Sequence, residues 1–226
     1  MPHVEINKPI LEHNDRLAAA NRATLSEHGV FMLDLLASPG AGKTSLILAT
    51  IEQLRQHLNI AVIEGDIASD VDAQRVKACG VPAVQINTGG ACHLEAAMIQ
   101  RALAVLELEK LDLIIVENVG NLVCPTDFYL GEDAKVMILS VPEGHDKPLK
   151  YPGVFQVAEA VVLNKVDTMA VFNFDERQFR LDVSRLNPQA TVFPVVAAGA
   201  AAGRGIKTWT QWLAARVQAK RDGAQQ

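Results

Sequence analysis

The chain has 226 residues, 49% of them apolar, and a formal net charge of −5. This length is typical of one domain with a large core, and the lack of a long basic run argues against nucleic acid as a partner. No segment approaches the ~20 apolar residues of a membrane span, and the N-terminus lacks a signal-peptide pattern. From the lack of such a span we expect no membrane partner. Because three cysteines make a poor disulfide framework, we expect a cytoplasmic protein.

The pattern of apolar residues predicts a helix first and then alternating strands and helices. Leu11, Leu17, Ala18 and Leu25 recur near helical spacing, and Gly29 is a suitable helix end. Strand-length apolar runs follow at residues 30–37, 60–63, 81–86, 113–116, 136–141, 160–163 and 191–198. Helical patterns between them cover residues 45–57, 94–108 and 206–217. This alternation predicts a three-layer α/β fold with a mostly parallel sheet of about seven strands.

Residues 38–44, SPGAGKT, follow the first strand and open a helix, which is the setting of a phosphate-binding P-loop. Its glycines let backbone N–H groups turn toward the β-phosphate, and the helix N-terminus adds a positive dipole. Lys43 would reach the β- and γ-phosphates, and the Thr44 hydroxyl would bind Mg²⁺. The expected nucleotide-binding residues here are Gly40, Ala41, Gly42, Lys43, Thr44 and Ser45. The usual pattern has Gly where Ala37 stands, and a glycine-rich turn with a chance lysine is the alternative.

Two acidic residues end apolar strands. Asp66 and Glu117 are expected at the carboxyl edge of the sheet, where ligands of parallel sheets gather. A carboxylate there can hold Mg²⁺ and orient the attacking water, so we assign Lys43, Asp66 and Glu117 as catalytic. Gly120 could offer its N–H to a γ-phosphate. The alternative is that either carboxylate caps the turn that follows it.

Residues 164–167, NKVD, follow another strand and fit the pattern that reads guanine. The Asp167 carboxylate can accept hydrogen bonds from guanine N1–H and the exocyclic amine, which adenine cannot supply in that arrangement. Asn164 would fix the loop and contact the base, and the Lys165 stem would cover the ring. Around Ala200 a second loop keeps the backbone N–H for guanine O6 but lacks the usual lysine.

These motifs divide the chain into an N-terminal helical segment (1–29), packed on or projecting from a P-loop GTPase domain (30–217), and a C-terminal tail (218–226). The predicted reaction is hydrolysis of GTP to GDP and phosphate. We identify no arginine finger or water-positioning glutamine in the sequence, so slow intrinsic turnover is expected.

Cys92, His93 and Cys124 offer thiolate and imidazole groups, which bind Ni²⁺ and Zn²⁺. Their spacing is not that of a zinc finger, and a cysteine can equally be a small buried hydrophobe. However, Cys124 follows the 117–120 stretch, which would respond to the γ-phosphate, so a metal there would be coupled to the nucleotide. A symmetric dimer would supply the three ligands twice and complete a shared site.

The chain resembles the hydrogenase nickel-incorporation GTPases of the HypB family over nearly its whole length. The resemblance is carried by residues 38–44, 65–66, 85–94 (QINTGGACHL), 117–125 (ENVGNLVCP), 143–152 (EGHDKPLKYP) and 164–167. It implies a SIMIBI-class GTPase that dimerises with nucleotide and binds nickel or zinc at Cys92, His93 and Cys124. It also implies transfer of Ni²⁺ to a maturation partner that loads the large subunit of a [NiFe]-hydrogenase.

Two other functions remain open from the sequence. One is a related metallochaperone GTPase that serves urease or another metalloenzyme. The other is a non-catalytic, GTP-controlled dimerisation module with a structural zinc. Residues 1–22 contain only His3 and His13 and no cysteine, so we do not expect the tail-based nickel site of some HypB relatives.

Overall fold

The computed structural model describes residues 8–66 and 71–224, and its centre is a seven-stranded sheet in which every neighbouring pair is parallel. The strand order is β3-β2-β4-β1-β5-β6-β7. The strands are β1 (Phe31–Ala37), β2 (Ile60–Asp66), β3 (Ala83–Asn87), β4 (Leu113–Glu117), β5 (Ala134–Ser140), β6 (Ala160–Asn164) and β7 (Thr191–Pro194). The predicted parallel sheet and its number of strands are confirmed.

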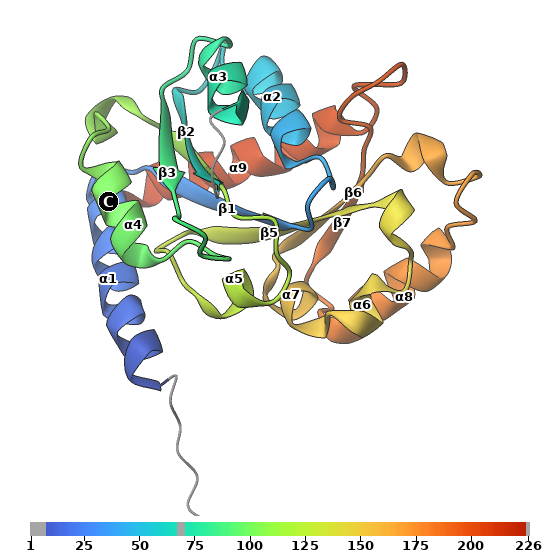
Figure 1. Ribbon diagram of the computed structural model, residues 1–226. Helices are drawn as coiled ribbons and strands as arrows, with labels where there is room; N and C mark the ends of the chain where they lie inside the picture. The colour runs from blue at the N-terminus through green and yellow to red at the C-terminus, as the bar shows by residue number, and fades with distance from the viewer. Residues whose placement is uncertain (1–7, 67–70, 225–226) are drawn as a thin grey trace, which may run out of the picture.

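Helices cover both faces of the sheet, which gives the predicted three layers (Figure 1). The α-helices are α1 (Lys8–Glu27), α2 (Lys43–Leu54), α3 (Val71–Lys77), α4 (Ala96–Leu103), α5 (Cys124–Asp127), α6 (Lys147–Lys150), α7 (Pro152–Val157), α8 (Glu176–Leu186) and α9 (Ile206–Ala224). Short 3₁₀ turns are η1 (Leu108–Lys110), η2 (Val141–Glu143) and η3 (Val166–Thr168). The helices α2 and α9 pack on one face, and α1, α4, α7 and α8 pack on the other.

The alternation of side chains along β1 shows how the two faces are separated. Leu33 and Leu35 belong to the core under α2 and α9, whereas Met32 and Leu36 belong to the cores on the opposite face. Asp34 lies between Met32 and Leu36 and therefore points to that opposite face. The strands at the centre of the sheet are buried, which explains why they read as continuous apolar runs.

Several element boundaries differ from the sequence prediction for identifiable reasons. The helix expected from residue 94 begins at Ala96, because the Leu94 N–H is bonded to the Asn118 side chain instead. The strand expected over 191–198 ends at Pro194, and residues 195–203 form a loop. A hydrogen bond from the Gly203 N–H to the Val196 carbonyl, at 2.9 Å, closes this loop.

The two terminal helices pack together on the domain. The predicted N-terminal helix is present as α1 and contacts α4 and α9. The C-terminal helix was expected to end near residue 217, with a tail over 218–226, but α9 continues to Ala224. Lys220 and Arg221 explain the extension, because they pair with Asp133 at 2.6 Å and Asp112 at 3.1 Å. Among the described residues, no helix is both long and apolar enough to cross a membrane.

Candidate nucleotide and metal site

The predicted phosphate loop, residues 38–44, begins directly after β1 and runs into the first turn of α2. Ala37 is fully buried at the end of β1, so the methyl group that replaces the usual glycine is accommodated in the strand. Gly40 and Gly42 have φ angles of 77° and 100°, which side-chain-bearing residues rarely adopt. Gly42 precedes the first residue of α2, Lys43, so the helix N-terminus opens onto the loop. Ser45 lies in the first turn of α2 and is half-buried.

The predicted base-reading loop is bonded directly to the phosphate loop. The Asn164 amide donates to the Ala41 carbonyl at 2.9 Å, and Lys165 Nζ donates to the Gly40 carbonyl at 2.8 Å. A Cβ atom at Gly42 would collide with the Asn164 amide, so only glycine allows this approach. Lys165 itself is held in the left-handed region at φ 59°, an arrangement that proteins keep mainly at functional sites.

The same asparagine joins the second predicted base loop. Asn164 Oδ1 accepts from the Lys165 and Ala197 backbone N–H groups at 2.8 and 3.1 Å. Asp167 is exposed in η3, and Ala200 is exposed in the loop that begins at Ala197. The structure therefore brings NKVD, the 197–203 loop and the phosphate loop to one edge of the sheet, with the Asp167 carboxylate accessible to a base.

The acidic candidates lie at the same edge. The Thr44 hydroxyl donates to Glu117 Oε1 at 3.0 Å, which places two hard oxygen ligands side by side. Asp66 ends β2, but its side chain lies outside the part that the structure describes. Gly120 lies against the phosphate loop, since a Cβ atom there would come within 2.9 Å of the Pro39 ring. Sequence reasoning missed Glu64, a buried carboxylate that is the cross-strand partner of Glu117.

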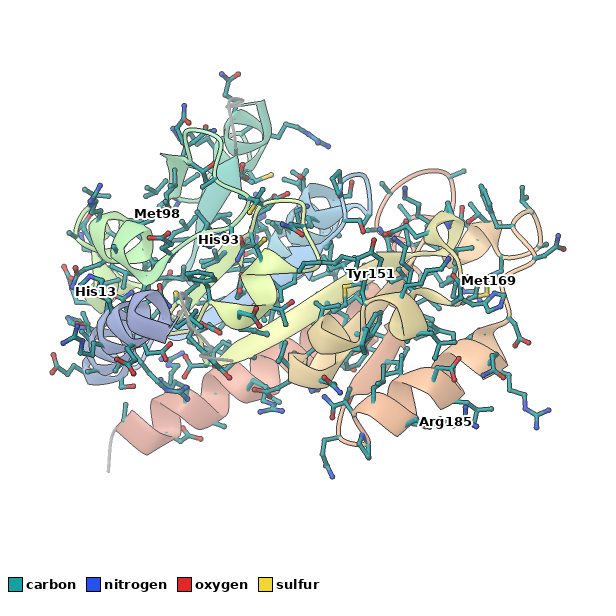
Figure 2. All side chains as sticks on the ribbon, turned by 60° about the horizontal axis from the view of Figure 1, so that its bottom comes forward. His13, His93, Met98, Tyr151, Met169 and Arg185 are labelled. Carbon is teal, nitrogen blue, oxygen red and sulfur yellow. The ribbon has the colours of Figure 1, made fainter. Side chains whose placement is uncertain are left out.

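Cys92, His93 and Cys124 are brought together although they are far apart in the chain. Their ligand atoms all lie within 4.8 Å of one another, a spacing that a single metal ion could bridge. His93 lies between α4 and α5 (Figure 2). Its ring packs on Phe128, with 3.9 Å between centroids, and its Nδ1 is 3.6 Å from Cys92 Sγ. In the described part of the chain, His93 Nε2 is buried without a hydrogen bond.

The electrostatics of these three residues suit a site that exchanges protons for a metal. Burial lowers the pKa of His93, and Glu95, 3.7 Å from Nε2, offsets this only in part. The lowered pKa favours the neutral imidazole that binds metals. A hydrogen bond between the Cys92 thiol and the Cys124 sulfur is the main cause that raises the pKa of Cys92, and burial adds to it. Metal binding at this thiol pair must therefore release protons.

Several side chains that bond the segments carrying the candidate metal ligands, or the residues next to them, were not identified from the sequence. The Asn121 amide donates to the Cys92 carbonyl at 3.2 Å, and Asn118 Oδ1 accepts from the Leu94 N–H at 3.2 Å. On α1, Asn14 bonds the Ala96 N–H and the Tyr129 carbonyl at 2.9 and 2.7 Å. Asn21, seven residues later, donates to the carbonyls of Ala96 and Leu130. Two asparagines on the apolar side of a helix are the sequence signal that could have indicated them.

Comparisons with known proteins show which family this chain resembles. A family model described as CobW/HypB/UreG, nucleotide-binding domain, matches residues 33–194. The hydrogenase maturation factor HypB of Azotobacter chroococcum mcd 1 is 48% identical over 97% of this chain and 72% of its own length. The protein of the same name from Escherichia coli (strain K12) is 43% identical over 93% of this chain and 71% of its own length.

Solved structures of the same group share the fold. The chain superposes on hydrogenase maturation factor HypB from Archaeoglobus fulgidus with a TM-score of 0.84, at 36% identity over 91% of this chain and 99% of that one. It superposes on HypB from Helicobacter pylori in complex with nickel with a TM-score of 0.86, at 38% identity over 92% and 97% of the two chains. The phosphate loop, the NKVD loop and the matched residues together show that this chain belongs to the HypB group of the CobW/HypB/UreG nucleotide-binding family.

Proposed function

We propose that this protein is a GTP-hydrolysing metallochaperone that binds nickel, or zinc, at Cys92, His93 and Cys124 and delivers nickel during [NiFe]-hydrogenase maturation. The observation that carries the proposal is the clustering of these three ligands within 4.8 Å. One of them, Cys124, ends the short segment that begins with Glu117, whose carboxylate contacts Thr44 of the phosphate loop. Only six residues, 118–123, therefore separate the proposed nucleotide ligand Glu117 from the proposed metal ligand Cys124.

The nucleotide chemistry follows from the residues around the phosphate loop. Water attacks the γ-phosphate in line, and GDP and phosphate leave. Lys43 and the N–H groups at the start of α2, with that of Gly120, stabilise the negative charge that develops. Thr44, Glu117 and Asp66 would hold Mg²⁺, which neutralises phosphate charge when bound; the adjacent Thr44 and Glu117 oxygens fit this role. Since we identify no arginine finger in the sequence, we expect slow intrinsic turnover, in which hydrolysis acts as a timer.

Base selection rests on Asp167. Its exposed carboxylate accepts from guanine N1–H and the exocyclic amine, and the Ala200 backbone N–H donates to guanine O6. Asn164 and Lys165 hold the loop against the phosphate loop, so the base and phosphate sites have a defined spacing.

The metal is a cargo. Two thiolates and one imidazole suit both Ni²⁺ and Zn²⁺, and three protein ligands leave positions for water or for an acceptor protein. A nucleotide-dependent homodimer would bring two such sets together on its two-fold axis. Loss of the γ-phosphate would loosen the dimer and release the metal to a maturation partner in the cytoplasm, which loads the hydrogenase large subunit.

One relative favours a second target. The Helicobacter pylori protein, 44% identical over 84% of this chain and 79% of its own length, is named hydrogenase/urease maturation factor HypB. Delivery of nickel to urease is therefore the second candidate function. The nickel content of hydrogenase and of urease, each purified from cells with and without this gene, separates the two targets.

The test is a Ni²⁺ titration of the metal-free protein with GDP and with a non-hydrolysable GTP analogue. We expect the nickel affinity or stoichiometry to differ between the two nucleotides. Cys92→Ala and Cys124→Ala should abolish high-affinity binding, while Cys79→Ala, a cysteine outside the cluster, should leave it intact. Equal nickel binding in both nucleotide states would contradict a coupled metallochaperone.

A further inference from the structure

Four polar side chains are buried beneath the loops that carry the metal ligands: Asp34, Asn118, Glu132 and Lys135. Asp34 of β1 and Lys135 of β5 are cross-strand partners, and Lys135 Nζ lies 3.9 Å from Asp34 Oδ2 and 3.4 Å from Glu132 Oε1. Burying such charges is costly unless further hydrogen bonds satisfy them. Here those bonds reach both segments of the metal site.

Asn118 connects this buried cluster to the segment that carries Cys92 and His93. Its amide nitrogen donates to Asp34 Oδ1 at 3.0 Å. Its oxygen accepts from the backbone N–H of Leu94, the residue after His93, and from that of Val119. The side-chain amide of Asn118 thus bonds both to β1 and to the residue after His93.

Lys135 connects the cluster to the segment that carries Cys124. Its ammonium group donates to the carbonyls of Pro125 at 3.0 Å and Phe128 at 2.8 Å. These carbonyls lie in and just after α5, whose first residue is Cys124. Because the Phe128 ring packs on His93, Lys135 also supports the contact between the two segments.

The link to the nucleotide is the peptide bond between Glu117 and Asn118. Successive side chains at the end of a strand point to opposite faces of the sheet. Glu117 points to the side of α2 and accepts from Thr44, whereas Asn118 points to the side of Asp34 and Leu94. A shift of the Glu117 backbone is therefore passed to Asn118 through the peptide bond that joins them.

We propose that Asn118, Asp34 and Lys135 are positioning residues that couple the nucleotide site to the metal ligands. This inference rests on the proposed function and names the parts that perform the coupling. When Glu117 moves with the γ-phosphate and its metal, Asn118 pulls on Leu94 and Asp34. The Asp34–Lys135 pair passes the shift to Pro125, and the separation of His93 and Cys124 changes. Buried polar groups with few alternative partners make such a cluster switch between discrete arrangements.

The experiment measures Ni²⁺ affinity with GDP and with a non-hydrolysable GTP analogue in wild type and in Asn118→Ala, Asp34→Asn and Lys135→Met. The quantity of interest is the ratio of the two nickel dissociation constants, since allosteric coupling typically changes affinity about 5–150-fold. A matched control is Asn187→Ala, which also removes side-chain bonds to backbone carbonyls, those of Phe155, Gln156 and Ala158, none of which belongs to the Asp34 cluster.

We expect the ratio to fall to about one in the three variants, while each variant still binds GDP and binds nickel with either nucleotide. Asn187→Ala should keep the wild-type ratio. Asp34→Asn is nearly isosteric, so it carries the test if Lys135→Met does not fold. As a second readout, hydrogen exchange of the Leu94 amide should become nucleotide-independent in Asn118→Ala, because its acceptor is removed.

The outcomes separate the two proposals. If wild type shows a ratio above one and the three variants keep it, the positioning role is wrong and the metallochaperone function stands. If the variants lose nickel binding equally with both nucleotides, or Asn187→Ala also loses the ratio, the cluster is only a structural support. If the ratio of the two nickel dissociation constants is about one in wild type itself, the coupling in the proposed function fails, and this inference fails with it.

Discussion

Lys165 Nζ donates a 2.8 Å hydrogen bond to the carbonyl of Gly40, so the proposed base-reading loop and the proposed phosphate loop form one unit. The Asn164 amide adds a second bond, to the carbonyl of Ala41. A substitution that disturbs this unit affects nucleotide affinity as a whole, whereas one at the exposed Asp167 should affect only the choice of base.

Asp167→Asn should change nucleotide selectivity without loss of the fold. The amide cannot accept both hydrogen bonds from guanine, and sites of this kind discriminate by on the order of 10⁴-fold. An amide can instead donate to the C2 carbonyl of xanthine. We expect GTP affinity to fall by at least about 100-fold and xanthosine triphosphate to compete with it. Competition against a fluorescent nucleotide measures this, and unchanged GTP preference would exclude Asp167 as the base reader.

Glu117→Gln should slow hydrolysis and leave nucleotide binding nearly intact. The amide keeps the shape beside Thr44 but loses the charge that would hold a cation and orient water. We expect the single-turnover rate of phosphate release to fall by roughly 10²–10⁴-fold. The matched control is Glu109→Gln on the exposed side of η1. Retention of the wild-type rate would remove Glu117 from the catalytic set.

Asp34 should make stability depend on pH. Burial raises its pKa from 3.8 to about 7; Lys135 opposes the shift and Glu132 adds to it. The folded state therefore binds a proton that the unfolded state has lost, and the free energy of unfolding falls as pH rises from about 4 to about 7. In Asp34→Asn this loss is absent. Urea unfolding at several pH values should show that the free energy of unfolding of Asp34→Asn rises relative to that of wild type across this range. Asp15→Asn, an exposed change of the same kind, should show no such trend.

Removal of the Asn14 side chain should weaken the attachment of α1 and disturb the metal site. Asn14→Ala leaves the Ala96 N–H and the Tyr129 carbonyl without their partner in a buried place, at a cost of about 1–3 kcal/mol. For a domain of this size the melting temperature should fall by roughly 2–12 °C. Nickel affinity should fall too, since Ala96 follows His93 closely and Tyr129 follows Phe128. Asp15→Ala on the exposed side of α1 serves as the control, and a change in stability with no change in nickel binding would restrict Asn14 to a structural role.

The sequence by itself determined the parts of this protein that depend on neighbouring residues. Apolar runs of strand length alternating with helical patterns were sufficient for the parallel α/β sheet. The placement of residues 38–44 between a strand and a helix was predictable, because a phosphate loop requires glycines, Lys43 and Thr44 close together after a strand. NKVD was predictable for the same reason. Helix ends were less well predicted, because α9 is extended by ion pairs with Asp133 and Asp112, which lie far away in the chain.

Only the tertiary structure decided how these parts are joined. Cys92 and Cys124 are 32 residues apart, and their approach depends on β4 lying between β2 and β1 in the sheet. Asp34 reads in the sequence as an interruption of an apolar strand, yet it is the buried acceptor to which Asn118 is bonded. The burial of Asn14, Asn21 and Lys135 was likewise not predicted from the sequence, because a polar side chain in a helix or strand is normally assigned to the surface. Which polar groups are buried depends on contacts between distant segments, and those contacts exist only once the sheet and its covering helices have assembled.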